Sequence, residues 1–175
     1  MPPPGITVEI VASNTLSDLR RREADIAVRN TRPADPELIA KKVRDDTAHL
    51  YATENYLARI GGLHAMPDMS RVDFIGFDDN DPFFEGLNAL GMNLAPHNFP
   101  VLTGSHLVNW ELVKQGIGVG VMATRIGDAE PLVRRAAPWL ELFESPVWLV
   151  AHRKVKTSQR VRLIFDLLAK EIAAL

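Results

Sequence analysis

The chain has 175 residues, 46% of them hydrophobic and 24% charged, which is typical of one folded domain or of two small lobes that share a core. A net charge of −2 and a pI near 6.2 exclude the strongly basic surface of a nucleic-acid-binding domain. The absence of cysteine excludes a disulfide framework, a thiolate zinc site and a cysteine nucleophile. With neither a signal peptide nor a membrane-length apolar run in the sequence, we expect a cytoplasmic protein.

The start of the chain predicts a strand, a helix and a second strand. Ile6, Val8 and Ile10 alternate with polar residues, which is the period-two pattern of a strand. A short helix is expected near residues 16–23, and the compact apolar run 24–28 is typical of a buried parallel strand. We therefore expect an opening βαβ unit with a right-handed crossover.

The rest of the chain predicts further strands and helices in alternation. Extended segments are expected over residues 38–43, 50–52, 72–77, 99–102, 117–122 and 147–151. Helices are expected over residues 54–60, from Asp81–Pro82 to near Gly91, from Ser105 to Gly116, and over 158–173. The last helix places one apolar face inward, made of Val161, Ile164, Phe165, Leu168 and Ile172. This alternation predicts an α/β protein with parallel sheets.

Four stretches resemble the effector-binding domain of LysR-type bacterial transcription regulators. They are residues 18–29 (DLRRREADIAVR), 50–57 (LYATENYL), 113–121 (VKQGIGVGV) and 146–153 (PVWLVAHR). Each stretch alone has little specificity, because apolar strands and short helices occur in many proteins. Their order and spacing are far more specific, and together with the final helix the resemblance extends over nearly the whole chain.

The resemblance implies an α/β fold like that of type II periplasmic binding proteins. Two Rossmann-like subdomains would be joined by two crossovers near residues 47–49 and 136–138, with a small ligand in the cleft between them. Subdomain I would contain residues 1–47 and 138–175, and subdomain II residues 48–137. The family's sensing domain usually opens with one more strand and helix, preceded by a winged helix-turn-helix and a linker helix. Because this sequence shows none of these, subdomain I would be incomplete: either the chain is a fragment, or a partner chain fills the gap.

The turn formed by Thr103, Gly104, Ser105 and His106 is the leading candidate for ligand contact. A helix N-terminus after a parallel strand presents free N–H groups and the positive end of the helix dipole, which suits a carboxylate. Gly104 would let a ligand approach the backbone closely. The alternative interpretation is that Ser105 only caps the helix.

Two further pairs of residues follow predicted strands and would lie at the same edge of the cleft. Arg29 could hold a carboxylate with two hydrogen bonds, beside Asn30, although a surface ion pair explains Arg29 equally well. Met122 and Ala123 would supply apolar walls, with core packing as the alternative. For the neighbouring Val121 core packing is the preferred interpretation.

The remaining motifs indicate neither catalysis nor metal binding. The glycines of residues 116–120 follow a helix and precede a strand, the reverse of a dinucleotide-binding fingerprint. The acidic run 78–81 lacks the glycine and glutamate spacing of an EF-hand, and the five histidines lack metal-ligand spacing. There is no nucleophile elbow, and the basic run 152–156 is typical of a solvated face. We therefore expect no enzyme, no cofactor and no metal.

These observations together predict a ligand-sensing regulatory domain. A small organic effector, with carboxylates the leading candidates, would favour one relative orientation of the two subdomains. The change would pass through a dimer or tetramer interface to the DNA-binding domains of the intact regulator. The alternative is a transport-type solute-binding protein of the same architecture. A third possibility, an enzyme on this fold, would need a paired acid and base that these residues do not supply.

Overall fold

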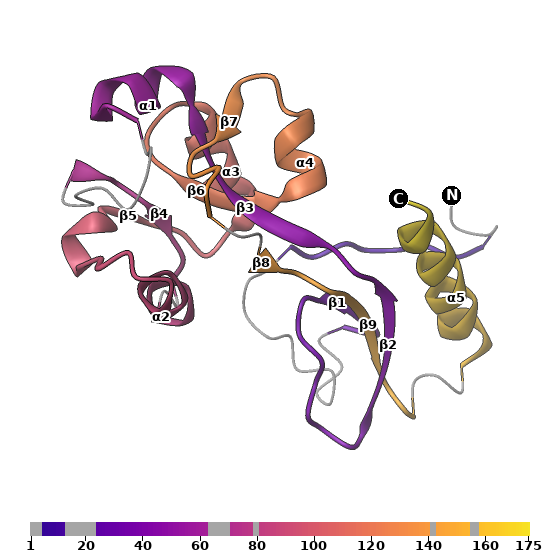
Figure 1. The fold of residues 1–175 in the computed structure, drawn as a ribbon. Coiled ribbons are helices and arrows are strands. Elements are labelled where there is room, and N and C mark those ends of the chain that lie inside the picture. Colours follow the sequence, from indigo (N-terminus) through magenta and orange to yellow (C-terminus); the bar gives the residue numbers. More distant parts are fainter. Residues whose placement is uncertain (1–4, 13–23, 63–70, 79–80, 141–142, 155–157) are drawn as a thin grey trace. The chain divides into compact units, whose positions relative to one another are not determined.

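The computed structural model describes residues 5–12, 24–62, 71–78, 81–140, 143–154 and 158–175 (Figure 1). The chain divides into two compact units. Unit 1 contains the described parts of Met1–Val11 and Leu16–Asp46 together with Glu144–Leu175, and unit 2 is built from Thr47–Phe143.

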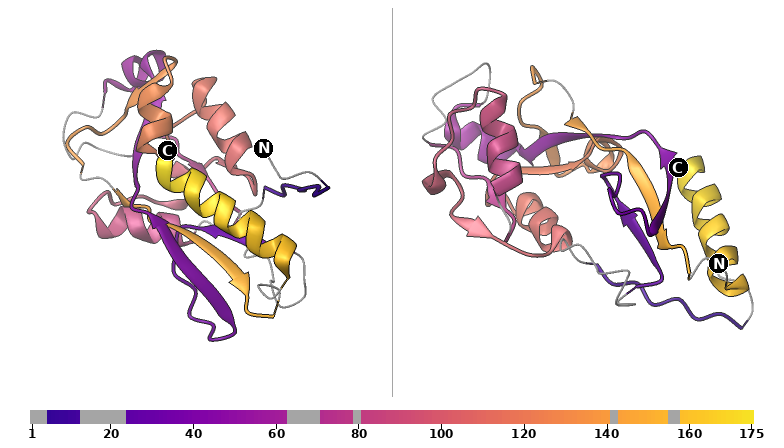
Figure 2. Two further views of the ribbon diagram at one scale, coloured as in Figure 1. Left: turned by 90° about the vertical axis from the view of Figure 1, so that its right-hand side faces the viewer. Right: turned by 90° about the horizontal axis from the view of Figure 1, so that it is seen from below.

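Unit 1 is an antiparallel sheet covered by a helix on one face. Strand β9 (Val147–His152) lies between β1 (Ile26–Arg29) and β2 (Leu38–Arg44), and both pairings are antiparallel. Helix α5 (Gln159–Ala174) lies alongside these strands (Figures 1 and 2). The core between helix and sheet contains Leu149, Ala151, Phe165 and Ala169.

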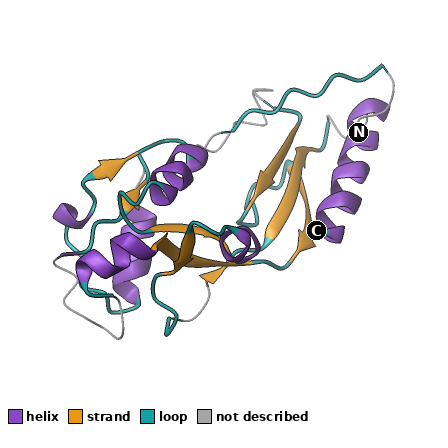
Figure 3. Cartoon of the chain, turned by 90° about the horizontal axis from the view of Figure 1, so that it is seen from above, coloured by secondary structure: helices purple, strands orange, loops and turns teal. Residues whose placement is uncertain are grey.

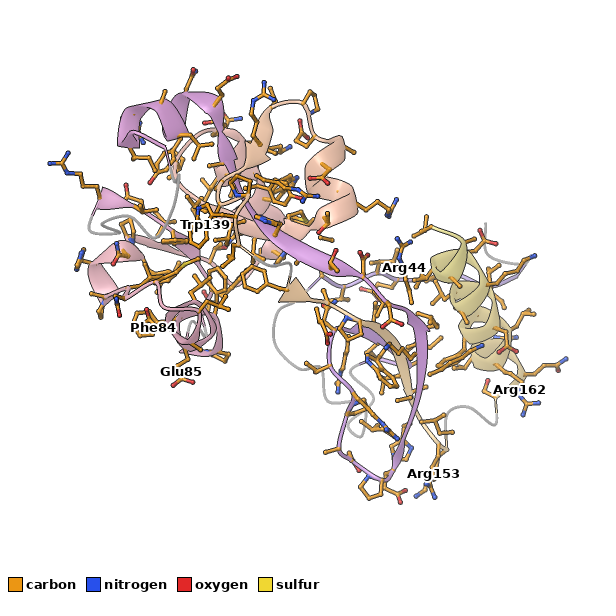
Figure 4. The ribbon with its side chains drawn as sticks, in the orientation of Figure 1. Arg44, Phe84, Glu85, Trp139, Arg153 and Arg162 are labelled. Atoms are coloured by element: carbon orange, nitrogen blue, oxygen red, sulfur yellow. The ribbon has the colours of Figure 1, made fainter. Side chains whose placement is uncertain are left out.

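The sequence predicts α5 well because its apolar residues recur at helical spacing. Ser158 precedes the helix at the N-cap position. The expected inward face is confirmed: Ile164 and Phe165 are buried, and Val161, Leu168 and Ile172 are half-buried. Arg162, which follows Val161, lies on the exposed side of the helix (Figure 4).

The predicted opening βαβ unit is wrong for the part that the structure describes. Residues 6–10 are extended, but no described strand pairs with them, and a strand forms only where a neighbour completes its backbone hydrogen bonds. The expected helix near 16–23 lies outside the described residues. β1 is confirmed close to its expected position, but it pairs antiparallel with β9.

Unit 2 contains the other strands and helices, which lie close together in Figure 3. In chain order they are β3 (Thr47–Thr53), α1 (Glu54–Ile60), β4 (Ile75–Gly76), α2 (Asp81–Ala89), the 3-10 turn Pro96–Asn98, β5 (Val101–Leu102), α3 (His106–Lys114), β6 (Gly120–Ala123), α4 (Thr124–Ala129), β7 (Val133–Arg135) and β8 (Phe143–Glu144).

The sheet of unit 2 is mixed, whereas the alternation of elements predicted parallel sheets. β3 pairs antiparallel with β6 and β7, and β8 also pairs with β3. β4 pairs parallel with β5. Phe74 forms a parallel bridge with Val119, and the Ile75 N–H donates to the Val119 carbonyl at 2.9 Å. These contacts tie β4 to the start of β6, so β4, β5 and β6 run in the same direction.

Both faces of this sheet are buried. Leu50 and Ala52 of β3 face one core, which also contains Phe74 and Phe99. Tyr51 faces the other core, which contains Trp110, Val113, Met122 and Ile75. This explains why β3 lacks the alternation of apolar and polar residues that a half-exposed strand shows.

The return of the chain to unit 1 comes later than the expected crossing near residues 136–138. Leu140 is buried in the first core of unit 2, and Trp139 and Phe143 pack against it. Figure 4 shows Trp139 among the side chains of unit 2. Because these apolar side chains are buried there, the chain stays in unit 2 through Phe143.

Helix α4 and strand β7 are held together by a polar network that the sequence analysis did not predict. The Tyr51 hydroxyl donates to Asp128 at 2.8 Å, and Arg135 Nε donates to the same carboxylate at 2.9 Å. Burial, followed by the hydrogen bond to Asp128, raises the pKa of Tyr51 to about 12. Gly127 packs directly on the Tyr51 ring, so a side chain has no room at this position.

None of the helices in the described part of the chain combines the length and the apolar content that crossing a membrane requires.

Two helical glycines give a matched test of the packing of Gly127 against the Tyr51 ring. Gly127→Ala places a methyl group against the Tyr51 ring, so we expect it to lower the free energy of unfolding by about 1–3 kcal/mol. Gly86→Ala in α2 meets no atom, so we expect it to be neutral or to stabilise by up to about 1 kcal/mol. Urea denaturation of both variants measures the difference, and equal stabilities would contradict the packing described here.

Candidate functional site

The carboxyl ends of β4, β5 and β6 lie at one edge of the unit 2 sheet. β4 is followed by Phe77 and Asp78, and β5 is followed by the turn of residues 103–105 that leads into α3. The Thr103 N–H donates to the Gly76 carbonyl at 3.3 Å, which fixes the turn beside the end of β4. This edge is where ligands bind most often in open α/β sheets.

Ser105 caps α3, as the sequence predicts. Its hydroxyl accepts from the Val108 N–H at 3.4 Å, and its own N–H donates to the Thr103 hydroxyl at 3.2 Å. The N–H groups of His106 and Leu107 lie in the first turn and have no carbonyl partner inside the helix. They and the positive end of the helix dipole provide a favourable place for an acceptor or an anion.

Asn109 fixes the start of α3 to the end of β4, and the sequence analysis did not identify it. Its side chain is fully buried, and Nδ2 donates to the Ile75 carbonyl at 2.9 Å and to the Gly76 carbonyl at 3.4 Å. Its Oδ1 has no donor among the described residues and lies beside Gly120 of β6. A side chain at position 120 would collide with this amide.

A stacked pair of rings forms an apolar wall at the same edge. The rings of Phe77 and His106 are nearly parallel, with centroids 5.2 Å apart. Phe83 of α2 meets the Phe77 ring edge-on, with centroids 5.6 Å apart. His106 is half-buried, and burial lowers its pKa. Burial therefore disfavours the protonated form of the ring.

Asp78 lies against Gly104, in the space where a ligand was expected to approach the backbone. A Cβ on Gly104 would collide with the Asp78 carboxylate. The side chain of Asp78 is exposed. The edge therefore offers first-turn N–H groups, a carboxylate and stacked rings. No group of three or more His, Asp or Glu side chains in the described part of the chain could hold a metal ion.

The last residues of β6 are less exposed than the turn of residues 103–105. Met122 is buried in the core with Tyr51 and Trp110, which favours the packing interpretation over a ligand wall. Ala123 is half-buried at the end of β6, immediately before α4. Val121 packs against the other core, as expected.

Arg29 and Asn30 belong to unit 1. Arg29 is the last residue of β1, half-buried, and lies opposite Trp148 in the register with β9. Asn30 is exposed, and its Nδ2 donates to the Ser145 hydroxyl at 2.9 Å. Part of the hydrogen-bonding capacity of Asn30 is therefore already used within unit 1.

The family model for the LysR substrate binding domain matches residues 3–173. The chain belongs to this family. Its fold is the type II periplasmic-binding-protein-like α/β fold of LysR regulators, and it resembles the regulatory domain of CrgA, a LysR-type transcriptional regulator from Neisseria meningitidis. That likeness has a TM-score of 0.71 at 22% identity, over 87% of this chain and 78% of that one.

Two other proteins extend the comparison. The effector binding domain of QuiR in complex with shikimate has a TM-score of 0.64 at 17% identity, over 90% of this chain and 75% of that one. An HTH-type transcriptional repressor of Pseudomonas aeruginosa is 29% identical over 104 residues, or 58% of this chain. This LysR-domain chain spans only 31% of that repressor's length. The relatives are regulators, which favours a sensor over a transport-type solute-binding protein.

The lowered pKa of His106 predicts a pH dependence of the free energy of unfolding. Because folding disfavours the protonated ring, the unfolded chain binds the proton more tightly. The contribution of His106 to the free energy of unfolding is therefore fully present above the ordinary pKa of about 6.5. It is lost as the pH falls from there through the lowered pKa. His106→Phe, which keeps a ring against Phe77, removes this part of the dependence of the free energy of unfolding on pH. Urea denaturation across this pH range measures it, and an unchanged slope in His106→Phe would contradict the assignment.

Proposed function

We propose that this LysR-family domain is the effector sensor of a transcription regulator, and that its effector binds at the carboxyl ends of β4, β5 and β6. The observation that carries the proposal is the turn of residues 103–105, which delivers the end of a parallel strand directly to the N-terminus of a nine-residue helix. The relatives, all regulators, support the same conclusion. The contacting residues would be Thr103, Gly104, Ser105, His106 and Ala123, with Met122 behind them.

The side chains at this edge restrict the chemistry of the effector. The first-turn N–H groups of α3 suit a carboxylate, but Asp78 lies beside them and repels an anion. An effector that also carries a hydroxyl or amino group can donate to Asp78 and offset the repulsion. We therefore propose a small hydroxy- or amino-carboxylate. Shikimate, the ligand of the related QuiR domain, is a hydroxylated carboxylate and belongs to this class.

Regulation follows if the effector binds one state of the domain better than another. This chain has a net charge of −2, which does not suit DNA binding. DNA contact would therefore come from a helix-turn-helix region, of the kind given in the name of the P. aeruginosa relative. We propose that the regulator acts in the cytoplasm as a dimer or tetramer and that its effect on DNA changes with the effector.

The effector site can be tested without damaging the helix cap. Ser105→Asp keeps a good N-cap residue but adds a negative charge where the carboxylate would bind. We expect unchanged stability and a loss of binding of about tenfold or more when hydroxy-carboxylates are titrated by calorimetry. Ser105→Ala, which loses the cap at a cost of about 1 kcal/mol, separates the two effects. Equal affinity in wild type and Ser105→Asp would contradict the site.

Asp78 should set the preference between effectors. With Asp78→Asn the repulsion disappears, so simple carboxylates that lack a donor should gain affinity, by about tenfold. Amino-carboxylates should lose affinity in the same variant, because an amide accepts a hydrogen bond less strongly than a carboxylate does. Calorimetry with matched pairs of acids measures both changes. If the preference did not change, Asp78 would have no part in selecting the effector.

The role of Arg29 stays a prediction from the sequence. Arg29→Ala should weaken carboxylate binding if the guanidinium contacts the effector. Arg162→Ala, on the exposed side of α5, is the matched control (Figure 4). Equal affinities in the two variants would exclude Arg29 from the site.

A further inference from the structure

The imidazole of His106 belongs to the first residue of α3. The backbone N–H of the same residue is one of the groups that have no carbonyl partner inside the helix. An acceptor on this N–H lies about 4–6 Å from the imidazole, which is the range in which an opposite charge favours the protonated form. A carboxylate bound there and the His106 ring therefore influence each other.

Stacking fixes the position of this ring beside the helix start. The planes of the His106 and Phe77 rings differ by 6°, with centroids 5.2 Å apart. Phe77 is held in turn by Phe83, whose ring meets it edge-on at 5.6 Å. The imidazole cannot turn away from the first turn of α3 without losing the stack. Because the ring is half-buried there, the site without an effector disfavours its protonation.

The charged side chains at this edge are exposed. Asp78 lies beside Gly104, Glu85 lies on α2 (Figure 4), and Arg125 follows the end of β6. Burial is the cause of the lowered pKa of His106, even though the Asp78 carboxylate belongs to the same edge. A carboxylate bound at the first-turn N–H groups would therefore add a counter-charge that the empty site lacks.

We propose that binding of a carboxylate effector is coupled to the uptake of a proton by His106, so that the domain binds the effector more tightly as the pH falls. This coupling rests on the proposed effector site at the start of α3. The imidazole, the free carboxylate and a proton combine to give an imidazolium beside the bound carboxylate, and the only new covalent bond is an N–H bond.

The direction of the coupling follows from linkage. A bound carboxylate favours the protonated ring, so the pKa of His106 is higher with the effector than without it. By reciprocity, protonation of His106 raises the affinity for the effector by the same factor. The affinity therefore rises as the pH falls through the range between the two pKa values, and it is constant above and below that range.

An uncharged ligand should give a different pH dependence. It would bury the His106 ring further without supplying a charge, and burial disfavours the protonated form. The affinity for the methyl ester of an acid should therefore stay constant or fall as the pH falls. The sign of the pH dependence thus separates coupling to the carboxylate charge from simple covering of the ring.

Calorimetric titration with shikimate, glycerate and serine, and with the methyl ester of each, tests the coupling. Between about pH 7.5 and about pH 5.5 the carboxylates of these acids stay ionised. We expect the dissociation constant of a bound acid to fall by about three- to tenfold over this range in wild type. In His106→Phe, which keeps a ring against Phe77, it should stay constant. His97→Gln, at an exposed histidine of the 3-10 turn in unit 2, is the matched control and should behave like wild type.

The ring C–H resonances of His106 test the coupling without any substitution in the site. Their titration by NMR should give a higher pKa with saturating acid than without it, and no increase with the methyl ester. Asp78→Asn should keep the pH dependence, because the counter-charge comes from the effector.

A dissociation constant that does not change with pH in wild type would overturn the coupling and leave the effector site standing. The same pH dependence in His106→Phe, or a pKa of His106 that saturating acid does not raise, would do so too. If none of the three acids bound at any pH, the coupling and the proposed effector site would both be overturned.

Discussion

The candidate effector site depends on the buried amide of Asn109. Its Nδ2 donates to the Ile75 carbonyl at 2.9 Å and, at 3.4 Å, to the Gly76 carbonyl, which also accepts from the Thr103 N–H. Both carbonyls belong to the two-residue strand β4. A buried carbonyl left without a donor costs about 1–3 kcal/mol, so the amide both stabilises the end of β4 and fixes where α3 begins. The direction in which the first-turn N–H groups point follows from this contact.

Packing around the amide shows why the site tolerates little change. Gly120 leaves room for Asn109, and Gly104 leaves room for Asp78. The stacked rings of Phe77 and His106 close the same edge with an apolar surface. The site is thus closely packed on the helix side and exposed at Asp78, which suits recognition of a small ligand by a few polar groups.

The elements that the sequence predicts well are those with a local pattern. The apolar stripe of α5 and the cap at Ser105 each depend on residues a few positions apart. The direction of strand pairing has no such signal, and the mixed sheet of unit 2 was therefore not foreseen. The strand expected at residues 6–10 has the right alternation, but alternation cannot show whether a neighbouring strand exists.

The turn that forms the candidate site could be predicted for the same reason. The turn of residues 103–105 is visible because serine follows glycine between an apolar run and a helical pattern. The contacts of Asn109 with Ile75 and of Asp78 with Gly104 join residues far apart in the sequence, and an asparagine inside a helix gives no local sign of such a partner. The carboxylate beside the helix N-terminus changes the expected effector from a simple acid to one that also carries a donor.

Amide chemical shifts offer the most direct measurement of where an effector binds. A hydroxy-carboxylate such as shikimate, titrated into the isotope-labelled chain, should move the backbone N–H resonances of Gly104, His106 and Leu107 in a saturable way. Their common dissociation constant should match the calorimetric value. Saturable shifts confined to other parts of the chain, or none with any acid of this class, would contradict the account.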